Sequence, residues 1–304
     1  MIDSKYLIEK TNRYYLNIAA ERSYSSFLNE KQFSLLKGYD EEKYRYKAAI
    51  YDKEKALYLG DKKTAKEKQI EAEEIRKKID KIISSIPSKE TSYNCKICND
   101  TGMIENGYCN CFKNRLILEA YKFLKVSPPL LSCFDDDKLS SVNNTQTLKC
   151  KLKKYADEFS DEKKNIILLG PAGTGKSFYA QCVVNQLQKN GLTPLFLTAF
   201  NLNDIAIGMF DKSPSEKMIV DEILSTADLL VIDDLGSEPI YNKITVENLL
   251  EIVSRRNEKN KPIFITTNLI TEEILTRYGE RIFSRITGKN TAILQLKGKD
   301  LRKE

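Results

Sequence analysis

The sequence contains no histidine, and its first 88 residues contain almost no glycine or proline. Without histidine, the chain has no imidazole to act as a general base, a metal ligand or a pH switch. Any hydrolysis is therefore expected to rely on carboxylates to handle the attacking water. Because glycine and proline are the residues that most often interrupt helices, their scarcity predicts a helical region at the start of the chain.

Long apolar runs are also missing. None approaches the roughly 20 residues that cross a bilayer, and residues 1–4 do not begin a signal peptide. A soluble cytoplasmic protein with no membrane partner is the expectation. The formal net charge of +6, among 30% charged residues, permits nucleic-acid binding without demonstrating it. With 304 residues, 41% of them hydrophobic, the chain can bury the cores of two domains.

Within the helical region, apolar residues recur at a 3-4-3-4 spacing, which places one stripe along a helix otherwise covered by Lys and Glu. The stripe consists of Ala72, Ile75, Ile79, Ile82 and Ile86. We expect it to pack against earlier helices in an intramolecular bundle. Those helices carry Tyr14, Leu16, Ile18, Phe27 and Leu28. The alternative is that the stripe docks directly on another protein.

The segment GPAGTGKS at residues 170–177 follows the apolar run IILL and precedes a helix-compatible segment. This order and the G-x-x-x-x-G-K-[ST] spacing predict a phosphate-binding loop, because main-chain N–H groups turn inward around phosphates at the positive end of a helix. Lys176 is expected to reach the β- and γ-phosphates, and Ser177 to hold Mg²⁺. The predicted nucleotide-binding residues are Gly170, Pro171, Ala172, Gly173, Thr174, Gly175, Lys176, Ser177 and Phe178.

A second apolar run, LLVI at residues 229–232, ends in the carboxylate pair Asp233 and Asp234. The run is typical of a buried parallel strand whose C-terminal end brings Asp233 to the Mg²⁺ ion. Asp234 is then placed to orient or deprotonate the attacking water. Taken alone, the same run would also suit a core strand that ends in a solvated turn.

The run PIFITTN, residues 262–268, predicts a third strand ending in Asn268. Its side chain could hydrogen-bond the same water or the γ-phosphate, although Asn is also common in turns. Further along, Arg281 and Arg285 are four residues apart on a predicted helix and share one face. That pair suits an anion on a neighbouring subunit, or else a plain solvated face.

Four of the seven cysteines form two close pairs, Cys95 with Cys98 and Cys109 with Cys111. A turn-rich segment joins the pairs, so four thiolates could converge tetrahedrally on Zn²⁺ in a small zinc ribbon. Because the second pair is C-x-C rather than C-x-x-C, incomplete coordination is the alternative. The other cysteines stand singly in apolar or helical surroundings and are expected to be buried thiols. They are Cys133, Cys150 and Cys182.

Together these motifs resemble the AAA+ ATPases of the bacterial DnaC/DnaI helicase-loader group. The resemblance rests on the phosphate loop, VIDDLG after the second strand, TTN after the third and GERIFSRI, and it covers the chain from about Phe134 onward. CKICNDTG followed by CNC is also similar to the cysteine module of many Firmicutes loaders. The resemblance implies a protein that binds ATP and Mg²⁺, self-associates, and acts on a replicative hexameric helicase and single-stranded DNA.

The resemblance also implies a role for each motif residue. Lys176 and Ser177 would belong to Walker A. Asp233 and Asp234 would form Walker B. Asn268 would be sensor 1, the polar residue that detects the γ-phosphate.

By the same resemblance, Arg285 would be the arginine finger that acts in trans, with Arg281 beside it, and Arg302 would be the sensor 2 arginine. The last assignment rests on position near the end of the chain. Asp234 stands where most AAA+ proteins carry Glu, so its carboxylate is one methylene shorter, which favours a slow switch over a motor. The chain ends soon after a strand predicted at residues 291–296, which leaves no room for a helical lid.

The predicted architecture is an α/β P-loop AAA+ core of parallel strands without a helical lid, preceded by an all-α region and a small zinc module with four cysteine ligands. The expected boundaries are residues 1–90 for a helical helicase-binding domain, 91–126 for the zinc module and its connecting helix, and 127–304 for the ATPase domain. The predicted function is ATP-dependent loading of the replicative helicase onto single-stranded DNA at replication initiation.

Two alternatives stay open at this point. One is an IstB-like transposition helper, although members of that group usually lack a cysteine module. The other is a non-hydrolysing adaptor whose surface is ordered by bound ATP. No basic, aromatic run marks a single-strand groove in the ATPase half. The candidate DNA contacts are Lys212, Arg255 and Arg256, although plain surface charge is the favoured interpretation of these residues.

Overall fold

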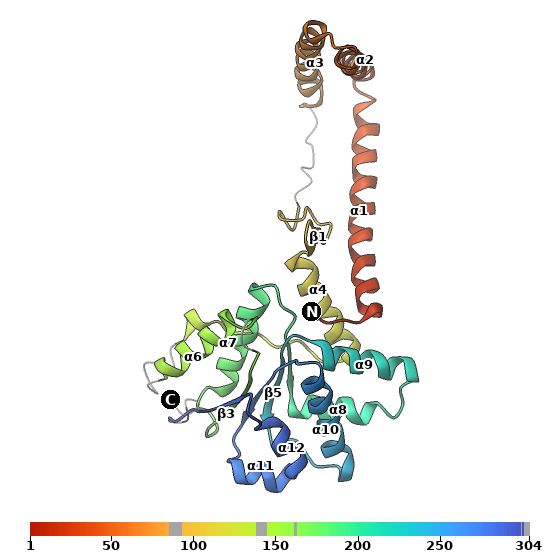
Figure 1. Ribbon diagram of the computed structural model, residues 1–304. Helices are drawn as coiled ribbons and strands as arrows, with labels where there is room; N and C mark the ends of the chain where they lie inside the picture. Colours follow the sequence, from red (N-terminus) through yellow and green to blue (C-terminus); the bar gives the residue numbers. More distant parts are fainter. Residues whose placement is uncertain (85–92, 138–144, 161–162, 299, 301–304) are drawn as a thin grey trace. The chain divides into compact units, whose positions relative to one another are not determined.

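The computed structural model describes residues 1–84, 93–137, 145–160, 163–298 and 300. These residues form two compact units, one made of residues 1–13 and 102–304, the other of residues 14–101. The helices, shown in Figure 1, are α1 (Lys5–Phe33), α2 (Tyr39–Tyr58), α3 (Lys62–Ile83), α4 (Asn110–Leu124), the 3-10 helix η1 (Phe134–Asp136), α6 (Gln146–Asp157), α7 (Lys176–Lys189), α8 (Ala199–Gly208), α9 (Pro214–Thr226), α10 (Asn242–Glu258), α11 (Thr271–Tyr278) and α12 (Glu280–Ile286). The strands are β1 (Met103–Ile104), β2 (Gly107–Tyr108), β3 (Asn165–Leu169), β4 (Leu195–Thr198), β5 (Leu230–Leu235), β6 (Ile263–Thr267) and β7 (Thr291–Gln295).

A five-stranded parallel sheet forms the centre of the larger unit, in the order β4-β5-β6-β3-β7. Its inner strands are nearly continuous apolar runs, as expected when helices cover both faces of a sheet. Figure 1 shows helices on the two sides of the strands. The predicted α/β core with a parallel sheet is confirmed, and β4, which we did not predict from the sequence, forms one edge.

Two apolar clusters cover the opposite faces of this sheet. Successive residues of a strand point to opposite faces, and β3 shows this directly. Ile166 and Leu168 belong to the cluster that includes residues of α6 and α7. Ile167 between them belongs to the cluster that includes residues of α4 and of α8 to α12. The central strands are thereby held from both sides, which fixes where their C-terminal ends lie.

The first residues of the chain pack within the larger unit. Ile2 and Leu7 are completely buried in the same cluster as α4 and α9. The N–H of Ile2 donates a hydrogen bond to the hydroxyl of Thr193 at 2.7 Å, and the N–H of Asp3 donates to the hydroxyl of Thr226 at 2.8 Å. The segment before residue 14 is therefore anchored to the sheet-containing unit by both burial and main-chain hydrogen bonds.

In the smaller unit, the predicted apolar stripe on α3 packs within the chain, but against α2. Ala72 and Ile75 are buried with Ala49 of α2. The prediction that α1 would cover the stripe was wrong, since Leu16 and Phe27 of α1 remain 68% and 58% exposed. Periodicity identifies a stripe that must be buried, but it does not identify the partner. Ile86, the last stripe residue, lies outside the described residues.

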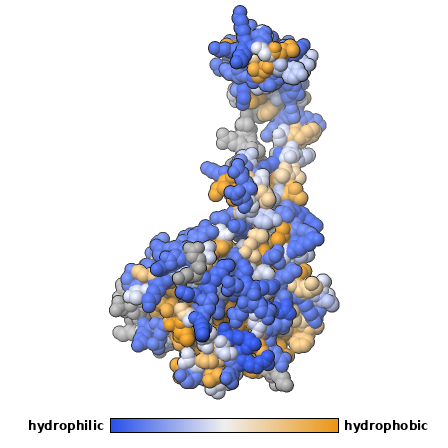
Figure 2. Space-filling view, viewed as in Figure 1, coloured by the Kyte–Doolittle hydropathy of each residue, from blue (hydrophilic) through white to orange (hydrophobic). Residues whose placement is uncertain are grey.

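The surface in Figure 2 is mostly hydrophilic, with smaller groups of hydrophobic residues. In the part of the chain that the structure describes, no helix is both long and apolar enough to cross a membrane. Among the single cysteines, Cys182 is buried as predicted and Cys133 is half-buried. The prediction of a buried thiol was wrong for Cys150, which is exposed because α6 turns Leu152 and Ala156 inward instead.

Candidate nucleotide-binding site

The loop that joins β3 to α7 has the backbone that a phosphate-binding loop needs. Gly173 and Gly175 adopt positive φ angles of 74° and 102°, a region that side chains rarely tolerate. The hydroxyl of the buried Thr174 donates to the carbonyl oxygen of Pro171 at 2.9 Å, which tightens the turn. Since α7 begins at Lys176, the positive end of the helix faces the loop.

The ammonium group of Lys176 lies inside this loop. Only 6% of the residue is exposed. The ammonium donates hydrogen bonds to the carbonyl oxygens of Gly170 and Pro171, both at 2.8 Å, and to Oδ1 of Asn268 at 2.5 Å. A buried ammonium needs such partners, because transfer from water to the interior is costly without them. A phosphate oxygen would offer Lys176 a stronger, charge-assisted partner at the same place.

Asp233 lies at the C-terminal end of β5 and is only 7% exposed. Its Oδ1 accepts a hydrogen bond from the hydroxyl of Thr266 at 2.6 Å. Burial raises the pKa of Asp233, and hydrogen bonds from Thr266 and Ser177 act in the opposite direction. The hydroxyl of Ser177 and the carboxylate of Asp233 are therefore neighbours, and both are oxygen ligands of the kind that Mg²⁺ prefers.

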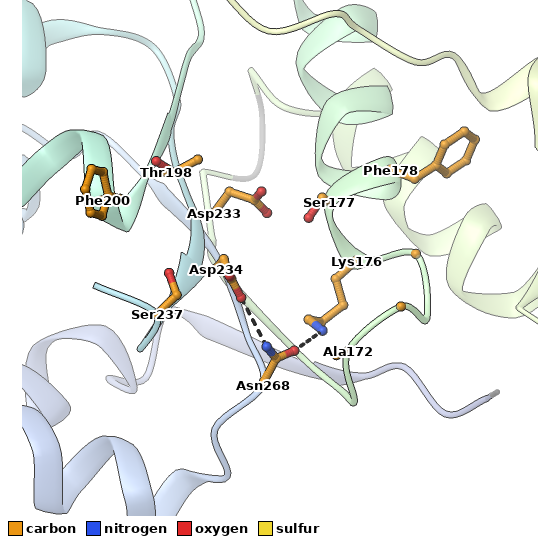
Figure 3. A pocket seen from close by; sticks show the side chains of 12 residues that line it. Ala172, Lys176, Ser177, Phe178, Thr198, Phe200, Asp233, Asp234, Ser237 and Asn268 are labelled. Carbon is orange, nitrogen blue, oxygen red and sulfur yellow. Dashed lines mark hydrogen bonds between the residues drawn. The ribbon is translucent and has the colours of Figure 1, made fainter. Parts of the chain in front are cut away.

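Asn268 connects the lysine to the second carboxylate. Its amide nitrogen donates to Oδ1 of Asp234 at 3.1 Å, while its oxygen accepts from Lys176. Figure 3 shows the amide between these two groups, while the side chains of Asp233 and Ser177 point toward each other. Three segments that are far apart in the sequence thus converge at one point, because each lies near or just after the C-terminal end of a strand in the same parallel sheet.

These residues line a pocket of about 610 Å³. Its lining comprises Ala172, Gly173, Gly175, Lys176, Ser177, Phe178, Thr198, Phe200, Asp233, Asp234, Ser237 and Asn268. An ammonium, two carboxylates, hydroxyls and an amide around one cavity can bind a polyphosphate together with a divalent cation and position a water. The predicted loop residues Gly170, Pro171 and Thr174 shape the turn without lining the cavity.

Three lining residues were not predicted from the sequence. Thr198 and Phe200 lie at the end of β4 and just beyond it, and that strand was not predicted, while Ser237 lies in the turn after β5. Thr198 also caps α8, since its hydroxyl accepts from the N–H of Asn201 at 3.0 Å. Phe178, although it lines the cavity, points its ring away from Lys176 in Figure 3.

The predicted arginines lie elsewhere. Arg281 and Arg285 are on α12, and Arg285 lines a different hollow, beside Lys163 and Lys289. The guanidinium of Arg285 donates to the carbonyl oxygen of Arg281 at 2.8 Å. Within one copy of the chain, the structure therefore does not bring either arginine to the pocket. Arg302 lies outside the described residues.

One candidate DNA contact is corrected by the structure. Arg256 is completely buried and donates to the carbonyl oxygens of Leu224, Ala227 and Pro262 at 2.6, 2.9 and 2.8 Å. Two of these carbonyls end α9, where a helix leaves its acceptors unpaired. Burial lowers the pKa of Arg256 to about 9. Its role is therefore structural, and it cannot contact DNA.

The other two candidates are at the surface and have partners in the protein. Arg255 pairs with Asp221 and, at 2.6 Å, with Glu251. The ammonium of Lys212 lies 5.7 Å from the centre of the Phe123 ring. Such contacts are ordinary for solvated surface charges.

The four clustered cysteines form a candidate metal centre. Their sulfur atoms all lie within 4.8 Å of one another, and Cys98 and Cys109 are buried while Cys95 and Cys111 are half-buried. Zn–S bonds of about 2.3 Å place the sulfurs of a tetrahedral site about 3.8 Å apart, so the cluster fits such an ion. Asp100 shapes the first pair by accepting from the N–H of Cys95 at 2.6 Å. The C-x-C spacing is thus compatible with four ligands.

A family model described as the IstB-like ATP binding protein matches residues 134–304, more than half of the 304 residues. The chain belongs to this IstB-like family. The match begins at η1 and includes the whole parallel sheet and every lining residue of the pocket. Membership of an ATP-binding family agrees with the nucleotide that we predicted for the phosphate loop.

Among curated relatives of this IstB-like chain is the replicative helicase loader DnaC of Escherichia coli strain K12, which is 32% identical over 139 residues, 45% of this chain and 55% of the relative. The protein of the same name from Buchnera aphidicola is 30% identical over 158 residues, 50% of this chain and 62% of the relative. The chain spans little more than half the length of these relatives. The predicted resemblance to the DnaC group is confirmed for this region.

Solved structures that align with part of this chain include the crystal structure of DnaI, with a TM-score of 0.44 and 19% identity over 59% of this chain and 92% of the other. The crystal structure of the DnaC helicase loader has a TM-score of 0.45 and 20% identity over 59% of this chain and 99% of the other. The family assignment of the IstB-like chain rests on its sequence.

Proposed function

We propose that this chain is an ATP-dependent loader of a replicative DNA helicase. The observation that carries the proposal is the convergence of Lys176, Asp233, Asp234 and Asn268 on one pocket, in a chain whose relatives include proteins named replicative helicase loaders. The pocket supplies the chemistry for binding and hydrolysing ATP. The relatives supply the reason to connect that chemistry with a helicase.

The proposed reaction uses the five polar pocket residues that the sequence predicted. The ammonium of Lys176 exchanges the carbonyls of the loop for phosphate oxygens of ATP. Ser177 and Asp233 hold Mg²⁺, which neutralises charge on the β- and γ-phosphates when it is bound. Asp234 orients the attacking water and takes its proton. Asn268 contacts the γ-phosphate and, through its hydrogen bond to Asp234, couples the presence of that phosphate to the position of the carboxylate. The shorter Asp234 side chain suits a slow, switch-like ATPase.

Arg285 is proposed to complete the site of a neighbouring copy. Within one chain it lies on α12, away from the pocket lining. An arginine that stabilises charge on a transferring phosphoryl group can be supplied in trans. Self-association through the ATPase domain, residues 127–304, would then be required for turnover.

Residues 1–90 are proposed to hold the helicase, and the four-cysteine module at 91–126 to bind zinc and connect the two domains. Capture of the cognate replicative helicase by the purified protein, with and without ATP, tests this part. Binding that increases with ATP supports a loader. If the helicase is not captured while ATP still binds, the loading function is lost and the nucleotide site stands.

Contact with single-stranded DNA is the remaining part of the proposed function. Titration of the full chain against an oligonucleotide, over a range of salt concentrations and with or without ATP, measures it. If the protein contacts the phosphate backbone of the DNA, the logarithm of the binding constant should fall linearly with the logarithm of the salt concentration. If no binding is detected even at low salt, single-stranded DNA is not a partner of this protein.

An IstB-like transposition helper is the second candidate, favoured by the description of the matching family. Co-purification with a cognate transposase, and not with a helicase, would select it. A non-hydrolysing adaptor is the third. If Arg285→Ala abolishes turnover but retains nucleotide binding, a shared ATPase site is supported, whereas a protein that binds ATP without any turnover would be an adaptor.

A further inference from the structure

The two carboxylates of the pocket come from consecutive residues of one strand. On a regular strand, neighbouring side chains point to opposite faces. Asp233 and Asp234 nevertheless both line the same cavity. The backbone of β5 must therefore depart from regular geometry at this point, and the departure is part of how the site is built.

The pairing of β5 with β6 shows the departure. Ile232 lies opposite Ile265, and the next pair is Leu235 with Thr267. Two residues of β5 therefore face a single residue of β6, Thr266. This count is that of a β-bulge, a feature that redirects side chains and is often found beside active sites.

The bulge has a conformational cost. Asp234 adopts a φ of 57°, in the left-handed region. Residues other than glycine are uncommon there, although Asp and Asn are tolerated better than most. A bulge also interrupts the ladder of main-chain hydrogen bonds. Such a conformation persists only where surrounding contacts hold it.

One hydroxyl supplies contacts to both carboxylate residues. The hydroxyl of Thr266, which is 0% exposed, donates to Oδ1 of Asp233 at 2.6 Å and accepts from the N–H of Asp234 at 2.9 Å. The carboxylate can only accept, so the hydroxyl proton is committed to Asp233 and an oxygen lone pair is left for the N–H. Thr266 thus fixes the side chain of one residue and the backbone of the other.

We propose that Thr266 is a positioning residue for Mg²⁺-dependent ATP hydrolysis, whose hydroxyl holds the bulge in the form that presents both carboxylates to the nucleotide. The inference rests on the proposed ATPase function. It assigns to Thr266 a contribution to metal use and turnover that is separate from the stability of the sheet.

Thr267 provides a matched control. It is the next residue of β6, it is also 0% exposed, and its hydroxyl donates to the carbonyl oxygen of Leu235 at 2.5 Å and accepts from the N–H of Leu269 at 3.0 Å. Replacing Thr by Val at either position removes one buried hydroxyl and keeps the shape of the side chain. Only at Thr266 does the lost hydroxyl contact a carboxylate.

The experiment compares the full chain with Thr266→Val, Thr266→Ser and Thr267→Val. For each we would measure the nucleotide Kd without Mg²⁺, the Mg²⁺ concentration for half-maximal turnover, and kcat. For Thr266→Val we expect kcat to fall about tenfold and the Mg²⁺ requirement to rise about fivefold, with the Mg²⁺-free Kd within about twofold. Thr266→Ser and Thr267→Val should stay within about threefold of the wild type in kcat.

Several outcomes would overturn the inference. These are a Thr266→Val protein with wild-type kcat and Mg²⁺ requirement, a Thr266→Ser protein as impaired as Thr266→Val, or a Thr267→Val protein with the same defect. Melting temperatures check that each variant is folded, and Thr266→Ala replaces Thr266→Val if the latter is not. If the wild type hydrolyses no ATP, the proposed ATPase function fails. The inference is then decided by how much Mg²⁺ increases the affinity for the nucleotide. This increase is expected to be smaller in Thr266→Val than in the wild type.

Discussion

The ammonium of Lys176 donates a hydrogen bond to the side-chain oxygen of Asn268 at 2.5 Å, although the two residues are 92 positions apart in the sequence. They meet because β3 and β6 are adjacent and parallel, with Leu169 opposite Thr267. A residue that follows either strand lies at the same edge of the sheet. Because Asn268 also donates to Asp234, a ligand that displaces Lys176 from Asn268 changes the surroundings of the second carboxylate.

Replacing Asn268 by Ala should slow turnover more than it weakens binding. The loop and Lys176 remain to hold the phosphates, but the link from Lys176 to Asp234 is lost. We expect kcat to fall at least about tenfold while the ATP Kd changes by less than about threefold. Steady-state kinetics and nucleotide titration measure both. Asn248→Ala, on α10 and outside the pocket lining, is the control, and equal effects of the two changes would refute the role of Asn268.

Mixing two inactive variants tests whether Arg285 acts in trans. Arg285→Ala keeps its own nucleotide pocket, and Lys176→Ala keeps its own arginine. A neighbour pair made of one copy of each contains one site with both groups, so the mixture should hydrolyse ATP faster than either variant alone. The ATPase rate is measured against the mixing ratio. If the mixture is no more active than the two variants measured separately, Arg285 either acts within its own chain or has no role in hydrolysis.

The buried Arg256 and its exposed neighbour Arg255 should differ sharply in their effect on stability. Arg256→Met removes the guanidinium that donates to three buried carbonyl oxygens, so the free energy of unfolding should fall by about 3 kcal/mol or more. Arg255→Met removes only surface ion pairs and should change it by less than about 1 kcal/mol. Urea denaturation of the two variants measures the difference. Similar losses would mean that the buried hydrogen bonds of Arg256 contribute little.

Zinc content should depend on the clustered cysteines and not on the others. The wild type is expected to hold one zinc per chain, and Cys98→Ser to lose most of it, because a hydroxyl is a much poorer ligand than a thiolate. Cys150→Ser, at an exposed position on α6, is the control. Elemental analysis of the purified proteins gives the ratio. Wild-type protein purified without chelators that contains no zinc would contradict the metal centre.

Much of the site could be predicted because its signals are local. The phosphate loop, the LLVIDD run and the TTN strand end each carry their pattern within a few residues, and parallel strands bring their C-terminal ends to one edge. The structure places Lys176, Asp233 and Asn268 together as that argument requires. The cysteine pairs carry their spacing in the same local way.

The remaining features depend on contacts between distant residues. β4 is a short run after Pro194, and no acidic residue marks its end. It is recognised as a strand only in the structure, by its pairing with β5. The bulge at Asp234 is defined by register against β6. The burial of Arg256 has no local signal either, because adjacent arginines look alike until the carbonyls that one of them contacts are known.

The most direct test of the account is the affinity of the full chain for ATP with Mg²⁺, compared with that of Lys176→Ala. Lys189→Ala, at the other end of α7, controls for the loss of a positive charge. Calorimetric titration should show the wild type and the control binding ATP alike. Lys176→Ala should bind about 100-fold more weakly, since it loses charge-assisted hydrogen bonds to phosphate. An unchanged affinity in Lys176→Ala would contradict the nucleotide site on which the proposed function depends.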